Sequence, residues 1–205
     1  MFITFEGIDG SGKSTQARSI AGWLYKEAAH GTLLTHEPGG WDGGQVLRNM
    51  VLTEGLRHRW SEPYLFMLDR AEHVARVIQP ALDSGKIVLC ERYHDSTLAY
   101  QSWGRGIPAD VLNSFFMASS FPKPDITVLF DVPVNVAAAR VARRGTPDNF
   151  EKEGVELMTK VRNGYIALSK IEPERWLVID CGANDTARIL AETKDRLIGR
   201  GVLNA

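Results

Sequence analysis

The residues best suited to chemistry form one glycine-rich stretch, Gly7-Ile8-Asp9-Gly10-Ser11-Gly12-Lys13-Ser14, which follows the pattern G-x-x-x-x-G-K-[ST]. Glycines lack a Cβ atom, so several backbone N–H groups can turn towards one anion at the positive end of a following helix. Lys13 would place its ammonium on the β- and γ-phosphates of a nucleotide, and Ser14 would offer its hydroxyl to Mg²⁺. The stretch therefore predicts a site for a nucleoside triphosphate and its metal ion.

The sequence on either side supplies the strand and the helix that this pattern requires. Phe2, Ile3 and Phe5 form a short apolar run typical of a buried strand, and apolar residues from Ala17 to Ala28 recur at helical spacing. A glycine-rich turn can also simply join a strand to a helix. The full pattern in this setting favours phosphate binding.

Further charged residues follow other predicted strands. Glu91 and Arg92 leave a continuous apolar run together, and a buried carboxylate and guanidinium are costly unless they meet partners. We expect those partners to be a metal ion, held by Glu91 and Ser14, and phosphates, held by Arg92. The segment Glu37-Pro38-Gly39-Gly40 also ends a strand, and ligands gather in such loops of parallel α/β sheets.

The elements that position these residues are predicted from the apolar pattern. The predicted strands are 2–5, 32–36, 87–90, 126–130 and 176–179. The predicted helices are 17–28, 45–52, 63–82, 134–143, 150–171 and 185–198, the third capped by Ser61. Strands that alternate with helices predict an α/β fold of the P-loop NTPase type. Its three layers would enclose a five-stranded parallel sheet with the strand before the glycine-rich stretch in the centre.

The expected organisation is a single domain over residues 1–205 with a short lid segment at about 141–152. A chain of 205 residues is long enough for one sizeable core and short for two. Gly145 and Pro147 prevent a continuous helix through the lid segment.

The composition is that of a soluble globular protein, with 24% charged residues, 44% hydrophobic residues and a net charge of -1. A net charge this close to zero gives no indication of nucleic-acid binding. Cys90 and Cys181 lie far apart and without metal-ligand spacing, which gives little support to a disulfide framework or a zinc site. Neither a targeting segment nor an apolar run long enough for a membrane span is seen. We expect a cytoplasmic protein without nucleic-acid or membrane partners.

Several more motifs occur in order along the chain. They are Glu37-Pro38-Gly39-Gly40, the segment Leu65 to His73 (LFMLDRAEH), the segment Arg92 to Gln101 (RYHDSTLAYQ), Gly104-Arg105-Gly106, and Asp131-Val132-Pro133 leading to Arg140. Together with the glycine-rich stretch, these motifs resemble the thymidylate kinases, a family of P-loop nucleoside-monophosphate kinases, over nearly the full length. The resemblance implies phosphorylation of dTMP to dTDP by ATP with Mg²⁺ as cofactor, and a homodimer.

The resemblance also implies an acceptor site. Phe66 would stack on thymine and Arg70, one helical turn later, would bond the edge of the base. Tyr100 would crowd the sugar and disfavour a 2′-hydroxyl, and Ser96 and Thr97 would offer hydroxyls to the base. A core role for Phe66 and helix capping for Ser96 and Thr97 are the alternatives. The implied substrate-binding residues are Asp9, Glu37, Pro38, Phe66, Arg70, Arg92, Ser96, Thr97, Tyr100 and Gln101.

The donor site and the catalytic groups are implied in the same way. The implied ATP-binding residues are Gly7, Asp9, Gly10, Ser11, Gly12, Lys13, Ser14, Thr15 and Arg140. A phosphate monoester is largely a dianion at pH 7 and needs no general base, so catalysis requires positive charge and in-line positioning. The expected catalytic residues are Lys13, Arg92, Asp9 and the lid arginines Arg143 and Arg144. Arg92 in a structural salt bridge, and lid arginines that are only surface charges, are the alternatives.

Four positions depart from the family pattern, namely His36, Trp41, Glu91 and Asn149. We expect these departures to affect substrate affinity more than the type of reaction. Trp41 and Glu91 also fit a deoxynucleoside kinase, in which Glu37 would be the general base for a sugar hydroxyl. A second alternative is an ATP-binding regulatory protein without activity.

Overall fold

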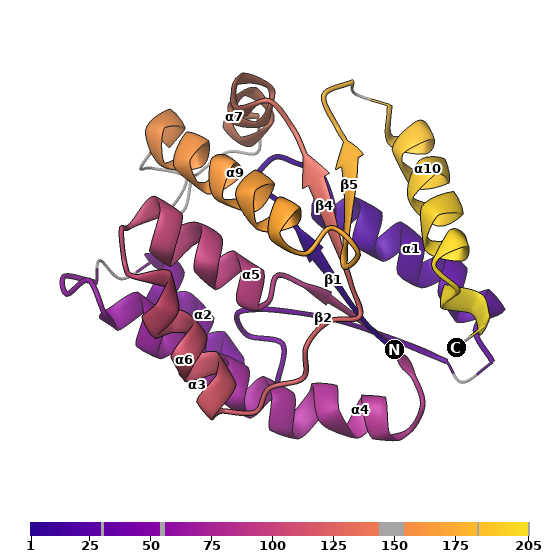
Figure 1. Cartoon of the computed structure of the whole chain (residues 1–205), viewed down its shortest axis with the longest axis horizontal. Helices are drawn as coiled ribbons and strands as arrows, with labels where there is room; N and C mark the ends of the chain where they lie inside the picture. Colours follow the sequence, from indigo (N-terminus) through magenta and orange to yellow (C-terminus); the bar gives the residue numbers. More distant parts are fainter. Residues whose placement is uncertain (30, 54–55, 144–153, 184, 205) are drawn as a thin grey trace.

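The computed structural model describes residues 1–29, 31–53, 56–143, 154–183 and 185–204 (Figure 1). Its strands are β1 (Phe2–Glu6), β2 (Thr32–His36), β3 (Ile87–Glu91), β4 (Ile126–Asp131) and β5 (Trp176–Asp180). They pair in parallel in the order β2-β3-β1-β4-β5. The predicted parallel sheet is confirmed, with the strand before the glycine-rich stretch at its centre.

The strands form where the chain offers short apolar runs because a parallel sheet is covered on both faces. Every residue of β1 is buried, as are the first four of β3 and the first five of β4. The register sets Phe5 beside Glu91 and places Glu6 beside Leu129. The carboxyl ends of β1 and β3 therefore open at the same edge of the sheet.

Helices cover both faces of the sheet. The helical elements are α1 (Lys13–Glu27), α2 (Gly44–Thr53), α3 (Ser61–His73), η1 (Val74–Ile78), α4 (Gln79–Asp83), α5 (His94–Thr97), η2 (Leu98–Gly104), α6 (Ala109–Ala118), α7 (Val134–Ala142), α9 (Gly154–Ile171), α10 (Thr186–Gly199) and η3 (Val202–Asn204). Figure 1 shows α1 and α10 side by side on one face, and α9 crossing the other face in front of β4 and β5. None of the described helices is long and apolar enough to cross a membrane.

The helix predicted at 63–82 differs from the prediction in two respects. It is a continuous run of α3, the π-helical η1 and α4, and Trp60 rather than Ser61 takes the N-cap position without a side-chain hydrogen bond. Its polar residues Asp69, Arg70 and His73 are almost fully buried, whereas Leu68 is 50% exposed. Apolar periodicity alone would place Leu68 inside and these polar residues outside, and the reverse holds because the polar side chains have hydrogen-bond partners inside the protein.

The lid predicted at about 141–152 falls mainly on residues 144–153, which lie outside the described part of the chain. Arg144 and Asn149 are among them. Helix α7 ends at Ala142 and Arg143 follows it as the C-cap residue. The helix predicted at 150–171 is described from Gly154.

Candidate active site

A cavity of about 610 Å³ opens at the carboxyl ends of β1, β2 and β3. This is the edge at which α/β sheets bind ligands. The predicted site residues that line it are Asp9, Gly10, Gly12, Lys13, Ser14, Thr15, Glu37, Pro38, Phe66, Arg70, Glu91, Arg92, Ser96, Thr97, Tyr100 and Gln101. Gly7, Ser11, Arg140 and Arg143 are not among its lining residues.

The glycine-rich stretch has the backbone that phosphate binding requires. Gly10 has φ of 85° and a Cβ there would collide with the backbone of Ala137. Gly12 has φ of 91° and forms the N-cap of α1, and a Cβ added there would meet no atom within 4 Å. The N–H groups at the start of α1 therefore face open space at the positive end of the helix, as an anion site needs.

Lys13 and Ser14 begin α1 beside the carboxylate that ends β3. The Nζ atom of Lys13 lies 3.1 Å from Asp9 Oδ1 and 3.9 Å from Glu91 Oε1, and Ser14 Oγ donates to Glu91 Oε1 at 2.6 Å. Burial, followed by the charge of Arg92, lowers the pKa of Lys13. The hydroxyl and the carboxylate oxygens form the kind of hard donor set that Mg²⁺ binds in nucleotide sites, so Ser14 and Glu91 fit the metal ion predicted from the sequence.

Arg92 directly follows β3 and lines the cavity. Its backbone φ of 66° is rare for a residue with a side chain. The guanidinium donates to Asp9 Oδ1 at 2.7 Å and to the Tyr100 hydroxyl at 3.1 Å, and it lies over the Tyr100 ring at 4.9 Å. Burial lowers the pKa of Arg92, but the Asp9 carboxylate, together with Tyr100, Tyr165 and Glu6, outweighs burial and raises that pKa well above its ordinary value. The guanidinium therefore stays charged.

Asp9 joins both cations and the tyrosine. Besides Lys13 and Arg92, it accepts a hydrogen bond from the Tyr100 hydroxyl at 3.0 Å. Burial raises the pKa of Asp9, whereas Arg92 and Lys13 lower it, and the net result is a pKa well below the usual range. Asp9 is therefore an anion at neutral pH that fixes two cations at one place.

The far end of the cavity carries the residues expected to recognise a base. Phe66 from α3 lines it, together with Arg70, Thr97 and Gln101. Arg70 Nη2 donates to Thr97 Oγ1 at 3.1 Å, and Gln101 Nε2 donates to Glu62 Oε2 at 3.3 Å. The structure thus gathers an aromatic side chain and several polar side chains in the same cavity as the glycine-rich stretch.

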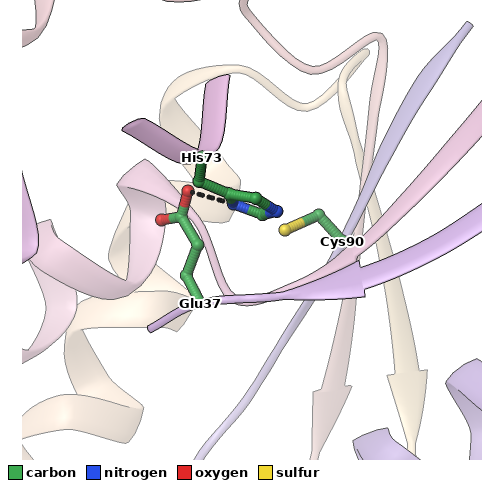
Figure 2. Close-up of side chains that lie close together, drawn as sticks. All are labelled: Glu37, His73 and Cys90. Carbon is green, nitrogen blue, oxygen red and sulfur yellow. Dashed lines mark hydrogen bonds and ion pairs between the residues drawn. The ribbon is translucent and has the colours of Figure 1, made fainter. Parts of the chain in front are cut away.

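Glu37 is held by partners of its own. Its Oε2 accepts from Arg70 Nε at 2.8 Å and its Oε1 lies 3.1 Å from His73 Nδ1, and the residue is 4% exposed (Figure 2). Both carboxylate oxygens are therefore engaged. The geometry gives no support to Glu37 as a general base for a sugar hydroxyl.

The loop after Glu37 is fixed by Asp69. The carboxylate of Asp69 accepts from the Gly39 backbone N–H at 3.0 Å and from Trp41 Nε1 at 2.9 Å, and Arg76 lies over the Trp41 ring at 5.3 Å. Burial, followed by the charge of Glu37, raises the pKa of Asp69. The unusual Trp41 therefore fastens this loop to α3.

Sequence reasoning missed two further arginines of the cavity. Arg18 and Arg48 line it beside His36, and Arg48 Nη1 donates to the Pro38 carbonyl at 3.0 Å. Burial, followed by the charge of Arg48, lowers the pKa of His36. Arg48 thus brings a positive charge to the 37–40 loop, where His36 with its lowered pKa supplies little. A basic residue on the helix that follows the Glu37 loop was the available signal.

Glu6 was missed as well. Its fully buried carboxylate accepts from Ser96 Oγ at 2.6 Å, from the Tyr165 hydroxyl at 3.0 Å and from the Tyr93 backbone N–H at 2.9 Å. Arg92 Nη1 lies 3.3 Å from both the Ser96 and the Tyr165 hydroxyls. Glu6 therefore holds the two hydroxyls, those of Ser96 and Tyr165, that contact the Arg92 guanidinium. A carboxylate that ends a buried strand, as Glu91 does, was the signal that could have found it.

Arg140, expected to bind ATP, and the two expected lid arginines are placed differently from one another. Arg140 donates to the Gly10 carbonyl and to the Cys181 carbonyl, both at 3.1 Å, so it braces the glycine-rich stretch against the end of β5. Arg143 is exposed at the end of α7, and Arg144 lies outside the described residues. The roles of all three arginines stay predictions.

Known proteins resemble this chain in sequence and in structure. The family model described as thymidylate kinase matches residues 5–189. The thymidylate kinase of Desulfovibrio desulfuricans is 43% identical and covers 88% of this chain and 87% of that protein. The thymidylate kinase of Solidesulfovibrio magneticus is 43% identical and covers 98% of this chain and 99% of that protein. The crystal structure of thymidylate kinase from Ehrlichia chaffeensis matches with a TM-score of 0.78 and 34% identity, covering 96% of this chain and 97% of that chain.

These comparisons confirm the resemblance drawn from the motifs, the α/β fold with its five-stranded parallel sheet, and the class of enzyme, a phosphotransferase. They give no support to the deoxynucleoside kinase or to the inactive regulator. The chain belongs to the thymidylate kinase family.

Proposed function

We propose that this chain carries out the reaction of its family, the phosphorylation of dTMP to dTDP by ATP, in the cavity at the edge of the sheet, with Mg²⁺ as cofactor. One observation carries the proposal. A single cavity is lined by the phosphate-binding loop, by Phe66 and Arg70, and by Arg92, which donates to Asp9 of that loop. Such a cavity fits a nucleotide acceptor whose phosphate faces the donor's phosphates.

The reaction needs positive charge more than it needs a base. The phosphate of dTMP is largely a dianion at neutral pH and is itself the nucleophile. Lys13 and Arg92 would neutralise the donor and the transferred phosphoryl group, and electrostatic stabilisation of this kind is the main contribution in phosphoryl transfer. Asp9, anionic and bonded to both, would keep the two cations in line with the phosphates.

Ser14 and Glu91 would hold the metal ion. Their oxygens lie 2.6 Å apart beside Lys13, at the start of α1, where the β- and γ-phosphates would bind. When bound, Mg²⁺ neutralises part of the charge on these phosphates. The family pattern has aspartate where this chain has Glu91, and the longer side chain reaches the Ser14 hydroxyl directly.

The acceptor would bind at the opposite end. Phe66 would stack on the thymine ring and Arg70 would donate to the edge of the base, while Tyr100, which contacts Asp9, would lie against the sugar. Arg48, close to Pro38 at the cavity wall, would attract the acceptor phosphate. This arrangement supplies a cation near His36, where the family pattern has arginine.

A coupled ADP-release assay tests this proposal. The acceptors are thymidine, dTMP, dUMP, dCMP, dGMP and AMP, each with ATP and Mg²⁺. We expect dTMP to give the highest turnover. Turnover of thymidine but not of dTMP would instead support a nucleoside kinase. Tight ATP binding without turnover of any acceptor would support a regulator.

We further propose that the chain forms a single domain with a lid segment at about 141–152. The lid would close over ATP and bring Arg143 or Arg144 to the transition state. The glycine-rich stretch contains no arginine, which supports a source elsewhere. An arginine finger contributes about 10³- to 10⁵-fold in turnover, so Arg143→Ala or Arg144→Ala should lower kcat and leave dTMP affinity nearly unchanged. Arg188→Ala on α10 is the matched control. Near wild-type turnover in both variants would contradict the proposal.

A homodimer is also proposed, with α2 and α3 at the interface. Val46 and Met50 on α2, and Tyr64 and Leu68 on α3, are exposed apolar side chains, each pair spaced one helical turn apart. Helices α2 and α3 pack together, so the four side chains can form one patch that a second copy would cover. Light scattering should give about twice the 22.8 kDa of one chain, and Leu68→Lys should reduce this mass to that of a monomer. A monomeric wild type would contradict the proposal.

A cytoplasmic location suits this enzyme. Both cysteines, Cys90 and Cys181, are free and buried, which fits a reducing compartment.

A further inference from the structure

A chain of buried hydrogen bonds runs from β2 to the base end of the cavity through Thr35, His73, Glu37 and Arg70, and we call it the relay. We propose that His73 is a positioning residue for base recognition: it locks Glu37, which in turn aims one donor of Arg70 at the acceptor base. His73 would thereby set the affinity for dTMP and the discrimination against a 4-amino pyrimidine. The inference rests on the proposed function of this cavity.

His73 is the centre of the relay. The residue is fully buried, with Nδ1 3.1 Å from Glu37 Oε1 and Nε2 2.6 Å from Thr35 Oγ1. Figure 2 shows the imidazole between Glu37 and Cys90, with its one drawn bond directed at Glu37. A carboxylate paired with an arginine accepts hydrogen bonds and does not donate them, so Nδ1 carries the hydrogen in this contact. The ring is thereby fixed at both nitrogens.

Glu37 passes this constraint to Arg70. With Oε1 held by His73, Oε2 lies 2.8 Å from both Nε and Nη2 of Arg70. Nη2 also donates to Thr97 Oγ1 at 3.1 Å. One edge of the planar guanidinium is therefore anchored to two side chains. An arginine held in this way cannot turn without breaking several hydrogen bonds.

The remaining nitrogen of Arg70, Nη1, takes no part in the relay. Arg70 lines the cavity, and its Nη1 is buried and has no hydrogen-bond partner among the described residues. A buried donor without a partner is costly, so a bound base is expected to supply the acceptor. Thymine presents O4, which accepts, whereas cytosine presents an amino group that donates. A rigid donor at this place therefore favours a 4-oxo pyrimidine.

A metal site is the other interpretation of this cluster. Glu37, His73 and Cys90 offer three ligand atoms within 4.8 Å of one another (Figure 2). The Arg70 guanidinium already neutralises Glu37, however, and both nitrogens of His73 have partners. The Cys90 thiol donates to the Arg92 carbonyl at 3.1 Å. The partners of these atoms favour a hydrogen-bonded relay over a bound cation.

The test compares His73→Phe with His73→Asn. Phenylalanine keeps the ring shape and removes both hydrogen bonds, so we expect the KM for dTMP to rise about tenfold, with kcat at saturating dTMP within about threefold of wild type and the KM for ATP unchanged. The preference for dTMP over dCMP in kcat/KM should fall by a similar factor. Asparagine places an amide nitrogen near the position of Nδ1 and should recover most of the dTMP affinity.

Cys90→Ser is the matched control, because it changes the same cluster outside the relay and keeps a donor for the Arg92 carbonyl. We expect its KM for dTMP to stay within about twofold of wild type. If His73→Phe does not fold, Thr35→Val tests the other end of the relay and should raise the KM for dTMP to a smaller extent.

Three results would overturn the inference. They are a fall in kcat with an unchanged KM for dTMP in His73→Phe, no recovery in His73→Asn, and an equal loss in Cys90→Ser. A wild-type enzyme that does not phosphorylate dTMP would overturn the proposed function instead, so the two failures are distinguishable.

Discussion

Replacing Glu6 by glutamine should remove a pH-dependent loss of stability. The Glu6 carboxylate is fully buried at the end of β1 and accepts hydrogen bonds from Ser96, Tyr165 and the Tyr93 backbone. Burial, followed by the nearby charge of Asp95, raises the pKa of Glu6 from 4.5 to about 7. Glutamine has the same shape and cannot ionise, so it resembles the protonated carboxyl at every pH.

The sign and size of the effect follow from linkage. Between pH 4.5 and about pH 7 the folded protein holds a proton on Glu6 that the unfolded chain has lost, so the free energy of unfolding falls as pH rises through this window. One pKa unit corresponds to about 1.4 kcal/mol, and the pKa difference of Glu6 therefore gives about 3 kcal/mol. Relative to wild type, the Glu6→Gln variant should gain about this amount between the two ends of the window.

The assay is urea unfolding of both proteins at several pH values between about pH 4.5 and pH 8. Burial lowers the pKa of His94 to about 4, so this histidine gives wild type a slope of opposite sign. The variant shares that slope, and it cancels in the difference between the two proteins. Glu174→Gln, at an exposed position, is the control and should follow wild type. Parallel curves for wild type and Glu6→Gln would refute the reasoning.

Two further predictions concern the two ends of the cavity. Phe66→Ala should weaken dTMP binding by about tenfold to a hundredfold, because base stacking on an aromatic ring contributes about 1 to 3 kcal/mol; calorimetry with dTMP measures this, and an unchanged Kd would place the base elsewhere. Ser14→Ala should raise the Mg²⁺ concentration needed to bind a non-hydrolysable ATP analogue, because a metal ligand beside Glu91 is lost; an unchanged Mg²⁺ requirement would remove Ser14 from the metal site.

The sheet and the glycine-rich stretch were predictable for local reasons. Strands covered on both faces appear in the sequence as continuous apolar runs, and the phosphate-binding stretch has positive φ at Gly10 and Gly12, a local conformation that favours glycine. The predicted substrate residues from Phe66 to Gln101 lie together at one cavity. They were predicted from motifs whose members lie close in the sequence.

The missed features depend on contacts between distant parts of the chain. Arg70 and His73 are buried because Glu37, more than thirty residues earlier, meets both of them. Periodicity assigns polar residues to the solvent face and carries no information on such pairs. The contribution of Glu6 likewise arises only when β1 meets Ser96 of α5 and Tyr165 of α9. At the start of α3 the N-cap position is taken by Trp60, one residue before Ser61, and its side chain makes no capping hydrogen bond.

The left-handed backbone of Arg92 links thermal stability to catalysis. For a residue with a side chain, this conformation costs about 1 to 2 kcal/mol. Glycine would adopt this conformation without strain, but it would remove the guanidinium that joins Asp9 to the Tyr100 hydroxyl. The strain at position 92 therefore cannot be relieved without losing the interactions that offset it and the charge that catalysis needs. Directed evolution for thermal tolerance should find its gains elsewhere in the chain.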